Sequence, residues 1–179
     1  MKRTTIILSL LTIAGSAWAQ APAEAIEKAL GAAPANLKAG AMVIKWKPDL
    51  TYDTLRPGTN RLVCYDRSGL PGQQAFSLEC TSVANLPRVA QNLKFEAMGA
   101  QKQAMLDAAE KDGTRVKPEY GSVWYHLMGA DKDHTRTHMT IAIPGATTAT
   151  TGLADNNKQG GVYIMNPGTT TAHIMTPGE

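Results

Sequence analysis

The stretch HMTIAIP (138–144) decides the fold class, because its apolar residues alternate with polar or small ones. Met139, Ile141 and Ile143 fall on one face of an extended chain, and the residues between them fall on the other. This period of two predicts a β-strand with one buried face. We expect these three side chains to pack against the long helix described below, since both apolar surfaces need a partner.

Further runs rich in branched and aromatic residues also predict strands. They are AMVIKW (41–46), RLVCYD (61–66), YGSVWYHLMG (120–129), GGVYIMNP (160–167) and TAHIMTP (171–177). The last two flank Pro167-Gly168-Thr169, which is typical of a hairpin turn. The Thr/Gly/Asn-rich segment 146–161 predicts a long loop with at most one helical turn.

Helical spacing of apolar residues appears in two places. The longer pattern runs from Asn85, a plausible N-cap, to Lys111, and Gly99 is where it would break into two helices. The shorter is PAEAIEKALG (22–31) near the N-terminus. Strands and helices without βαβ alternation favour the α+β class. We expect one domain, 20–179, with a largely antiparallel sheet against one long or broken helix, plus a short N-terminal helix.

The N-terminus has the three-part layout of a secretory signal peptide. A basic Met1-Lys2-Arg3 precedes the apolar run TIILSLLTIAG, and Ala17-Trp18-Ala19 supplies small residues at a cleavage site. We expect residues 1–19 to be removed, leaving a periplasmic or secreted protein of bacterial type. No later segment has the roughly 20 apolar residues that a membrane span needs.

The charge and the cysteines agree with export. The net charge is +3, of which Lys2 and Arg3 supply two, so the chain from Gln20 onward is nearly neutral. Its basic residues are spread among acids, which argues against a nucleic-acid partner. Cys64 and Cys80 are the only cysteines, and in an oxidising compartment such a pair predicts a disulfide worth about 3 kcal/mol.

The histidines are the candidates for a metal site. His134 and His138 would be about 13 Å apart in a strand and could not share one ion. His138 could join His126 and His173 if their strands are neighbours, and with nearby methionines this set would suit copper. Methionines usually fill cores, however, and no dense ligand motif occurs. We expect no metal and no cofactor, and keep His126, His138 and His173 as the metal candidates.

Nucleophilic catalysis has weaker support. No serine after residue 19 lies in a GxSxG elbow, so a Ser-His-Asp set could only form in space. Those serines are Ser68, Ser77, Ser82 and Ser122. The candidate acids include Asp131 and Asp133, but ADKDH (130–134) is more simply a charged turn. We therefore expect no catalytic residues, with a small hydrolase as the weaker alternative.

Three segments resemble parts of a family of uncharacterised exported bacterial proteins. They are AIEKALGAAPANLKAGAMVIKW (25–46), HMTIAIP (138–144) and GGVYIMNPGTTTAHIMTP (160–177). In that family an alanine-rich opening leads into a strand, and a Gly-Gly strand, a turn and an Ala-His-Ile-Met ending close the chain. The resemblance implies an exported single-domain protein, and it implies no activity, ligand or functional residue.

Long polar loops, a disulfide and the lack of a catalytic motif together favour a non-catalytic binding or structural module. The partner would be a protein, a cell-wall component or a small molecule. The alternatives are a periplasmic copper-binding protein using the three histidines, and the small hydrolase.

Overall fold

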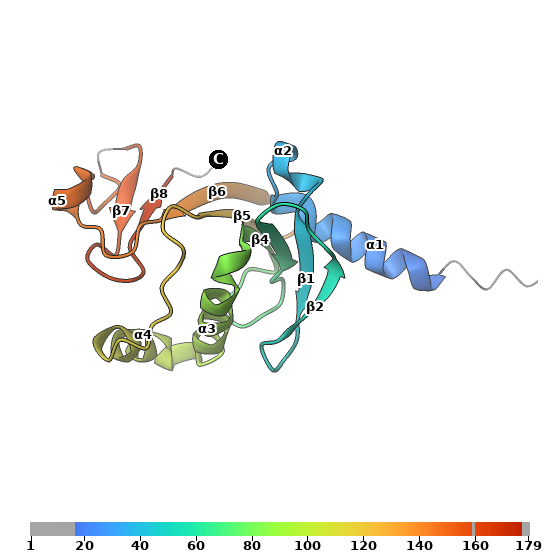
Figure 1. The fold of residues 1–179 in the computed structure, drawn as a ribbon, viewed down its shortest axis with the longest axis horizontal. Helices are drawn as coiled ribbons and strands as arrows, with labels where there is room; N and C mark the ends of the chain where they lie inside the picture. Colours follow the sequence, from blue (N-terminus) through green and yellow to red (C-terminus); the bar gives the residue numbers. More distant parts are fainter. Residues whose placement is uncertain (1–16, 159, 177–179) are drawn as a thin grey trace, which may run out of the picture.

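In the computed structural model, described for residues 17–158 and 160–176, one mixed sheet forms the centre of the molecule (Figure 1). The strand order is β2-β1-β3-β4-β5-β6-β8-β7. Neighbouring strands are antiparallel except for β1 and β3, which are parallel. The strands are β1 (Met42–Trp46), β2 (Tyr52–Arg56), β3 (Leu62–Asp66), β4 (Phe76–Ser82), β5 (Val123–Gly129), β6 (Thr135–Ala142), β7 (Tyr163–Met165) and β8 (His173–Met175).

The helical segments connect and cover this sheet, which confirms the α+β class. They are α1 (Ala17–Ala29), η1 (Leu30–Ala32), α2 (Ala35–Lys38), η2 (Val83–Asn85), α3 (Leu86–Glu96), η3 (Gly99–Gln101), α4 (Lys102–Lys111) and α5 (Thr148–Thr151). Among them, none combines the length and apolarity that crossing a membrane requires.

The helix predicted from 85 to 111 is broken. Gly99 has a φ of 56°, a left-handed conformation that favours glycine, and it separates α3 from α4. The N-terminal helix begins earlier than predicted, at Ala17, and contains Pro22. The single helical turn expected within 146–161 is α5, where the Thr147 and Thr150 side chains form a capping box.

Most of the expected signal peptide lies outside the described residues. A chain cleaved after Ala19 would keep the part of α1 from Gln20 to Ala29. Removal of residues 1–19 stays a prediction.

The two faces of the sheet are covered by different helices. On one face, Ala29 at the end of α1 and Leu30 at the start of η1 pack on Val43, Leu62 and the cysteine pair. On the other face, Leu86, Val89 and Leu93 of α3 pack on Ile44, Val63 and Tyr65. Successive strand residues point to opposite faces, so β1 and β3 each contribute to both cores.

The expected disulfide is present. Cys64 on β3 and Cys80 on β4 are directly opposed across the antiparallel pair and are bonded to each other. Both are fully buried under α1 and η1. The bridge closes the Gly/Pro-rich loop that joins the two strands.

One sequence prediction about the sheet is wrong. Met139 and Ile141 are only half-buried, and Met139 lies beside Gly31–Pro34 rather than against α3. His138, Thr140 and Ala142 lie on the face of β6 that α3 covers, and Thr140 and Ala142 are buried. Ile143 is buried, but in a separate small cluster with Ile164 and Ala172. The predicted alternation in β6 is present. Both faces of the strand are covered, however, so the more apolar face is not necessarily the one that α3 covers.

Candidate functional site

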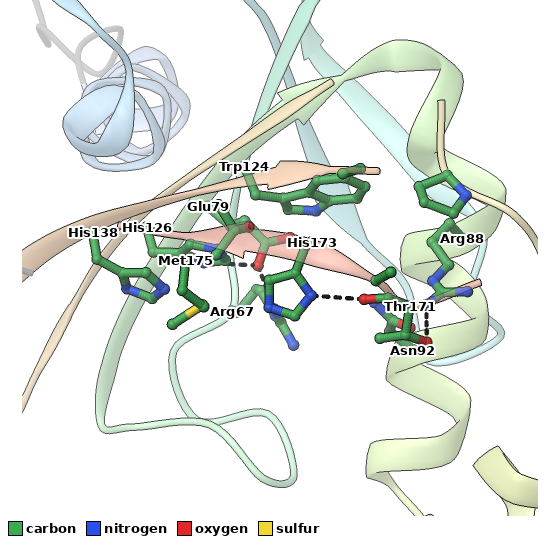
Figure 2. A pocket seen from close by; sticks show the side chains of 14 residues that line it. Arg67, Glu79, Arg88, Asn92, Trp124, His126, His138, Thr171, His173 and Met175 are labelled. Atoms are coloured by element: carbon green, nitrogen blue, oxygen red, sulfur yellow. Dashed lines mark hydrogen bonds and ion pairs between the residues drawn. The ribbon is translucent and has the colours of Figure 1, made fainter. Parts of the chain in front are cut away.

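The ionisable side chains that could bind a ligand or react gather in a cavity of about 260 Å³ between α3 and strands β4, β5, β6 and β8 (Figure 2). We call it the histidine cavity. Its polar and aromatic lining residues are Arg67, Glu79, Arg88, Asn92, Trp124, His126, His138, Thr140, Thr171 and His173. Apolar contributions come from Pro118, Ala142, Ala172 and Met175.

Strand register pairs two of the three candidate histidines. His126 on β5 is directly opposite His138 on β6, whereas His173 on β8, the next strand, pairs with Ala142, four residues along β6 from His138. All three line the cavity, as Figure 2 shows. In the C-terminal hairpin, Met165 lies opposite His173.

His134 is not part of the site. It lies in the exposed turn before β6, where its Nδ1 is 2.9 Å from the Asp131 carboxylate. The backbone N–H groups of Asp133 and His134 also donate to Asp131. The interpretation of ADKDH as a charged turn is therefore confirmed.

Glu79 is a buried carboxylate at the back of the cavity. It accepts hydrogen bonds from the Tyr65 hydroxyl and, at 2.5 Å, from Nη1 of Arg67. Nδ1 of His126 lies 3.3 Å from the same carboxylate. Burial by itself would raise the pKa of Glu79, but Arg67, His126 and Tyr65 together hold it well below its ordinary value. Glu79 is therefore ionised and accepts from three side chains.

Arg67 links Glu79 to the surface. Its second terminal nitrogen, Nη2, lies 2.6 Å from Glu96 of α3, and Glu96 also lies 3.7 Å from Lys102 of α4. Burial opposes the charge of Arg67, but Glu79 and Glu96 raise its pKa above the ordinary value. The four alternating charges compensate one another. This network joins β4 to both helices of the α3 face.

His126 and His138 are stacked. Their ring centroids are 4.5 Å apart and the ring planes differ by 14°. Since an ionised carboxylate can only accept, Nδ1 of His126 donates to Glu79 and its Nε2 remains for another partner. Burial and the neighbouring His126 lower the pKa of His138 to about 4, so His138 is uncharged at neutral pH.

A hydrogen bond to the backbone two residues earlier fixes the orientation of the His173 ring. Its Nδ1 is 2.7 Å from the Thr171 carbonyl oxygen, which can only accept, so this nitrogen carries a proton. Burial lowers the pKa of His173, and the hydrogen bond to Thr171 opposes that effect. The neutral ring therefore leaves Nε2 as a hydrogen-bond acceptor.

Arg88 lies at the far end of the cavity, in the first turn of α3. It is 4% exposed, and its guanidinium donates to the Val116 carbonyl at 2.5 Å and to the Thr171 hydroxyl at 2.7 Å. Burial and the nearby Arg115 lower the pKa of Arg88 to about 9, while Glu110 acts in the opposite direction. The side chain is charged at neutral pH.

The geometry argues against a shared metal ion. Imidazole lone pairs lie in the ring plane, so two nearly parallel stacked rings do not aim at one point. Within the described ranges, no three His, Cys, Asp or Glu side chains lie close enough to hold one ion. Recruiting His126 and His138 to one metal would require one ring to rotate.

The four serines after residue 19, all in the described part of the chain, lie outside the group of cavity histidines. None of Ser68, Ser77, Ser82 and Ser122 lines the histidine cavity. Ser82 and Ser122 line a different hollow with Tyr120 and Tyr125, and none of its lining residues is a histidine. Ser122 instead accepts a hydrogen bond from the buried Asn85 side chain.

Sequence reasoning missed Glu79, Arg67 and Arg88, which set the electrostatics of the cavity. The segment FSLECTS (76–82) alternates between apolar and polar residues, and such a pattern usually means that the polar face meets water. Here Ser77, Glu79 and Thr81 are buried instead. A charge in the middle of a strand next to a cysteine was the available signal.

Comparisons of this chain with protein-family models, with curated proteins and with solved structures found no match. The resemblance of its two ends to an exported family therefore stays a prediction.

Proposed function

We propose that this protein is an exported, non-catalytic domain that binds a small molecule in the histidine cavity. The observation that carries the proposal is the cavity, about 260 Å³ in volume, which combines an indole, a thioether and oriented polar groups. Ligand sites are typically concave, partly apolar and supplied with a few fixed polar groups. A purely structural module has no need for such a space.

The fixed orientation of the polar groups supports binding. Glu79 holds His126, the Thr171 carbonyl holds His173, and Val116 and Thr171 hold Arg88. Because these groups are already positioned, a ligand would not have to order them on binding. The N-terminal pattern of residues 1–19 supports the exported part of the proposal, and the Cys64–Cys80 bridge is compatible with an oxidising compartment.

A soft-metal site is the second candidate, and one observation favours it. Met175 lines the cavity together with His126, His138 and His173, and thioether with imidazole suits Cu(I). The parallel stacking of His126 and His138 counts against it. Titration with Cu(I) would separate the two: stoichiometric binding that is lost in both His138→Gln and Met175→Leu favours the metal.

Native mass spectrometry tests the small-molecule proposal. The protein is secreted by a bacterial host, purified without denaturation and measured before and after denaturation. A bound species that is released on unfolding, and that is missing from a Trp124→Ala variant, is the expected result. The proposal would be refuted if the wild-type protein carries no such species and if no small organic probe shifts the NMR signals of the cavity residues Trp124 and His173.

A further inference from the structure

The charges around the histidine cavity do not balance, and from this imbalance we infer that the ligand is a small organic anion. It would be a carboxylate with an apolar body, and its carboxylate would pair with Arg88. The inference rests on the proposed function, since it names the class of molecule that the same cavity holds.

The negative group in the cavity wall is already satisfied. Glu79 accepts from Tyr65, Arg67 and His126, so it has little capacity left for a cation on a ligand. The positive charge of Arg67 is in turn shared between Glu79 and Glu96, and Lys102 lies beside Glu96. Two cations and two carboxylates leave this side of the cavity neutral.

Arg88 is in a different position, because its hydrogen bonds go to neutral groups. They reach the Val116 carbonyl and the hydroxyls of Thr170 and Thr171. Glu110 is the nearby carboxylate, but it accepts from the Thr170 backbone N–H and from the same two hydroxyls. Arg88 is therefore connected to Glu110 only through threonine hydroxyls.

A second buried arginine adds to the excess of positive charge. Arg115 is 5% exposed and donates to the side-chain oxygens of Gln91 and Asn92, both neutral. Its Nε is buried without a hydrogen-bond partner within the described structure, as is Nε of Arg67. Glu110 and, to a smaller extent, Glu96 offset the charge of Arg115. Arg67, Lys102, Arg88 and Arg115 thus face three carboxylates, those of Glu79, Glu96 and Glu110, which leaves one positive charge around the cavity.

An anion is the ligand that this arrangement would stabilise. A buried charge without an opposite charge is costly, and a charge-assisted contact to a carboxylate would recover that cost. His138 and His173 are neutral at neutral pH and do not compete for the anion as charged groups. The apolar part of the ligand would lie between Trp124 and Met175, which line the same space (Figure 2).

Three probes test the charge and the apolar body separately. Benzoate has both features, benzamide keeps the ring but is uncharged, and inorganic phosphate is an anion without an apolar body. Binding to the disulfide-bonded exported protein is measured by calorimetry at constant ionic strength. Side-chain NMR signals of Trp124 and His173 report whether the cavity is occupied. We expect benzoate to shift both signals and to bind at least about tenfold more tightly than either other probe.

Two substitutions on α3 form a matched pair. Arg88→Gln removes the proposed partner, whereas Lys94→Gln removes the same charge from an exposed position on the same helix. Benzoate affinity should fall about tenfold or more in R88Q and stay unchanged in K94Q. Since Arg88 is buried and R88Q could fail to fold, Trp124→Leu provides a second variant. It should weaken benzoate binding without affecting phosphate.

Every outcome decides the inference. If benzamide shifts the Trp124 and His173 signals and binds as tightly as benzoate, the cavity binds small molecules but the anion inference is wrong. Preferential binding of phosphate would contradict the apolar body, and equal loss in R88Q and K94Q would contradict the role of Arg88. If no probe shifts either signal, the anion inference falls, while native mass spectrometry judges the proposed function independently.

Discussion

The two faces of the central strands use neighbouring residues for opposite purposes. Cys80 points toward α1 into a dry apolar layer with Leu30, Val43 and Leu62. Glu79, one residue earlier, points toward α3 and joins Tyr65, Arg67 and His126. The α1 face contributes stability through apolar burial and a covalent bridge, whereas the α3 face buries charges beside a cavity. Buried charges contribute little net stability, so their presence suggests a functional requirement.

Removing the carboxylate of Glu79 should have the largest effect. Glu79→Gln leaves Arg67 with half of its charge compensation in a buried site, and loss of a buried ion-pair partner costs about 3–5 kcal/mol. Urea unfolding monitored by circular dichroism measures the loss.

The control is Asp66→Asn, which removes a carboxylate from the more exposed ion pair with Lys28. That change should cost less than about 1 kcal/mol. If both variants lose the same amount of unfolding free energy, the stability of the α3 face does not depend on its buried charges more than the α1 face depends on an exposed ion pair.

Breaking the disulfide should affect stability without changing the cavity. The Cys64→Ala/Cys80→Ala variant lacks the link that closes the β3–β4 loop, and it should lose about 3 kcal/mol of unfolding free energy. His126 and His138 lie on the opposite face, so their NMR signals should stay near the wild-type positions. Large shifts of those signals would show that the two faces are coupled rather than independent.

Acidification should lower the free energy of unfolding by a smaller amount, through His138 on the α3 face. The pKa of His138 falls from its ordinary value of 6.5 to about 4 in the folded protein. Between these values the unfolded chain binds a proton that the folded protein does not bind, so stability is full above about pH 6.5 and decreases as the pH falls toward 4. With allowance for solvent screening, His138 accounts for about 1–2 kcal/mol of this loss.

The measurement is urea unfolding of the wild type and His138→Asn at about pH 7 and about pH 4.5. The variant should lose less stability on acidification than the wild type. Some loss should remain, because burial also lowers the pKa of His173. An identical pH dependence of both proteins would mean that His138 is not desolvated by its neighbours.

The sequence was informative wherever structure depends on near neighbours in the chain. The period of two in HMTIAIP, the single helical turn within 146–161 and the break at Gly99 are local properties, and all three appear in the structure. The cysteine pair was predictable because two cysteines allow one intramolecular bridge. The α+β class follows from the order of such local elements.

Only the tertiary structure decided which residues meet across the sheet. Strand β3 pairs with β1 rather than with the preceding β2, and β8 lies between β6 and β7. This order placed the strand of His173 next to the strand of His138, which in turn pairs with the strand of His126. It also made Glu79 a buried residue instead of an exposed one. Alternation along a strand distinguishes its two faces but does not say what covers each, because that depends on segments far away in the chain. The charge balance around Arg88 could not be predicted from the sequence for the same reason. It depends on residues that come together only when α3, α4 and the C-terminal hairpin pack against one another: Arg88, Glu110, Arg115 and Thr171.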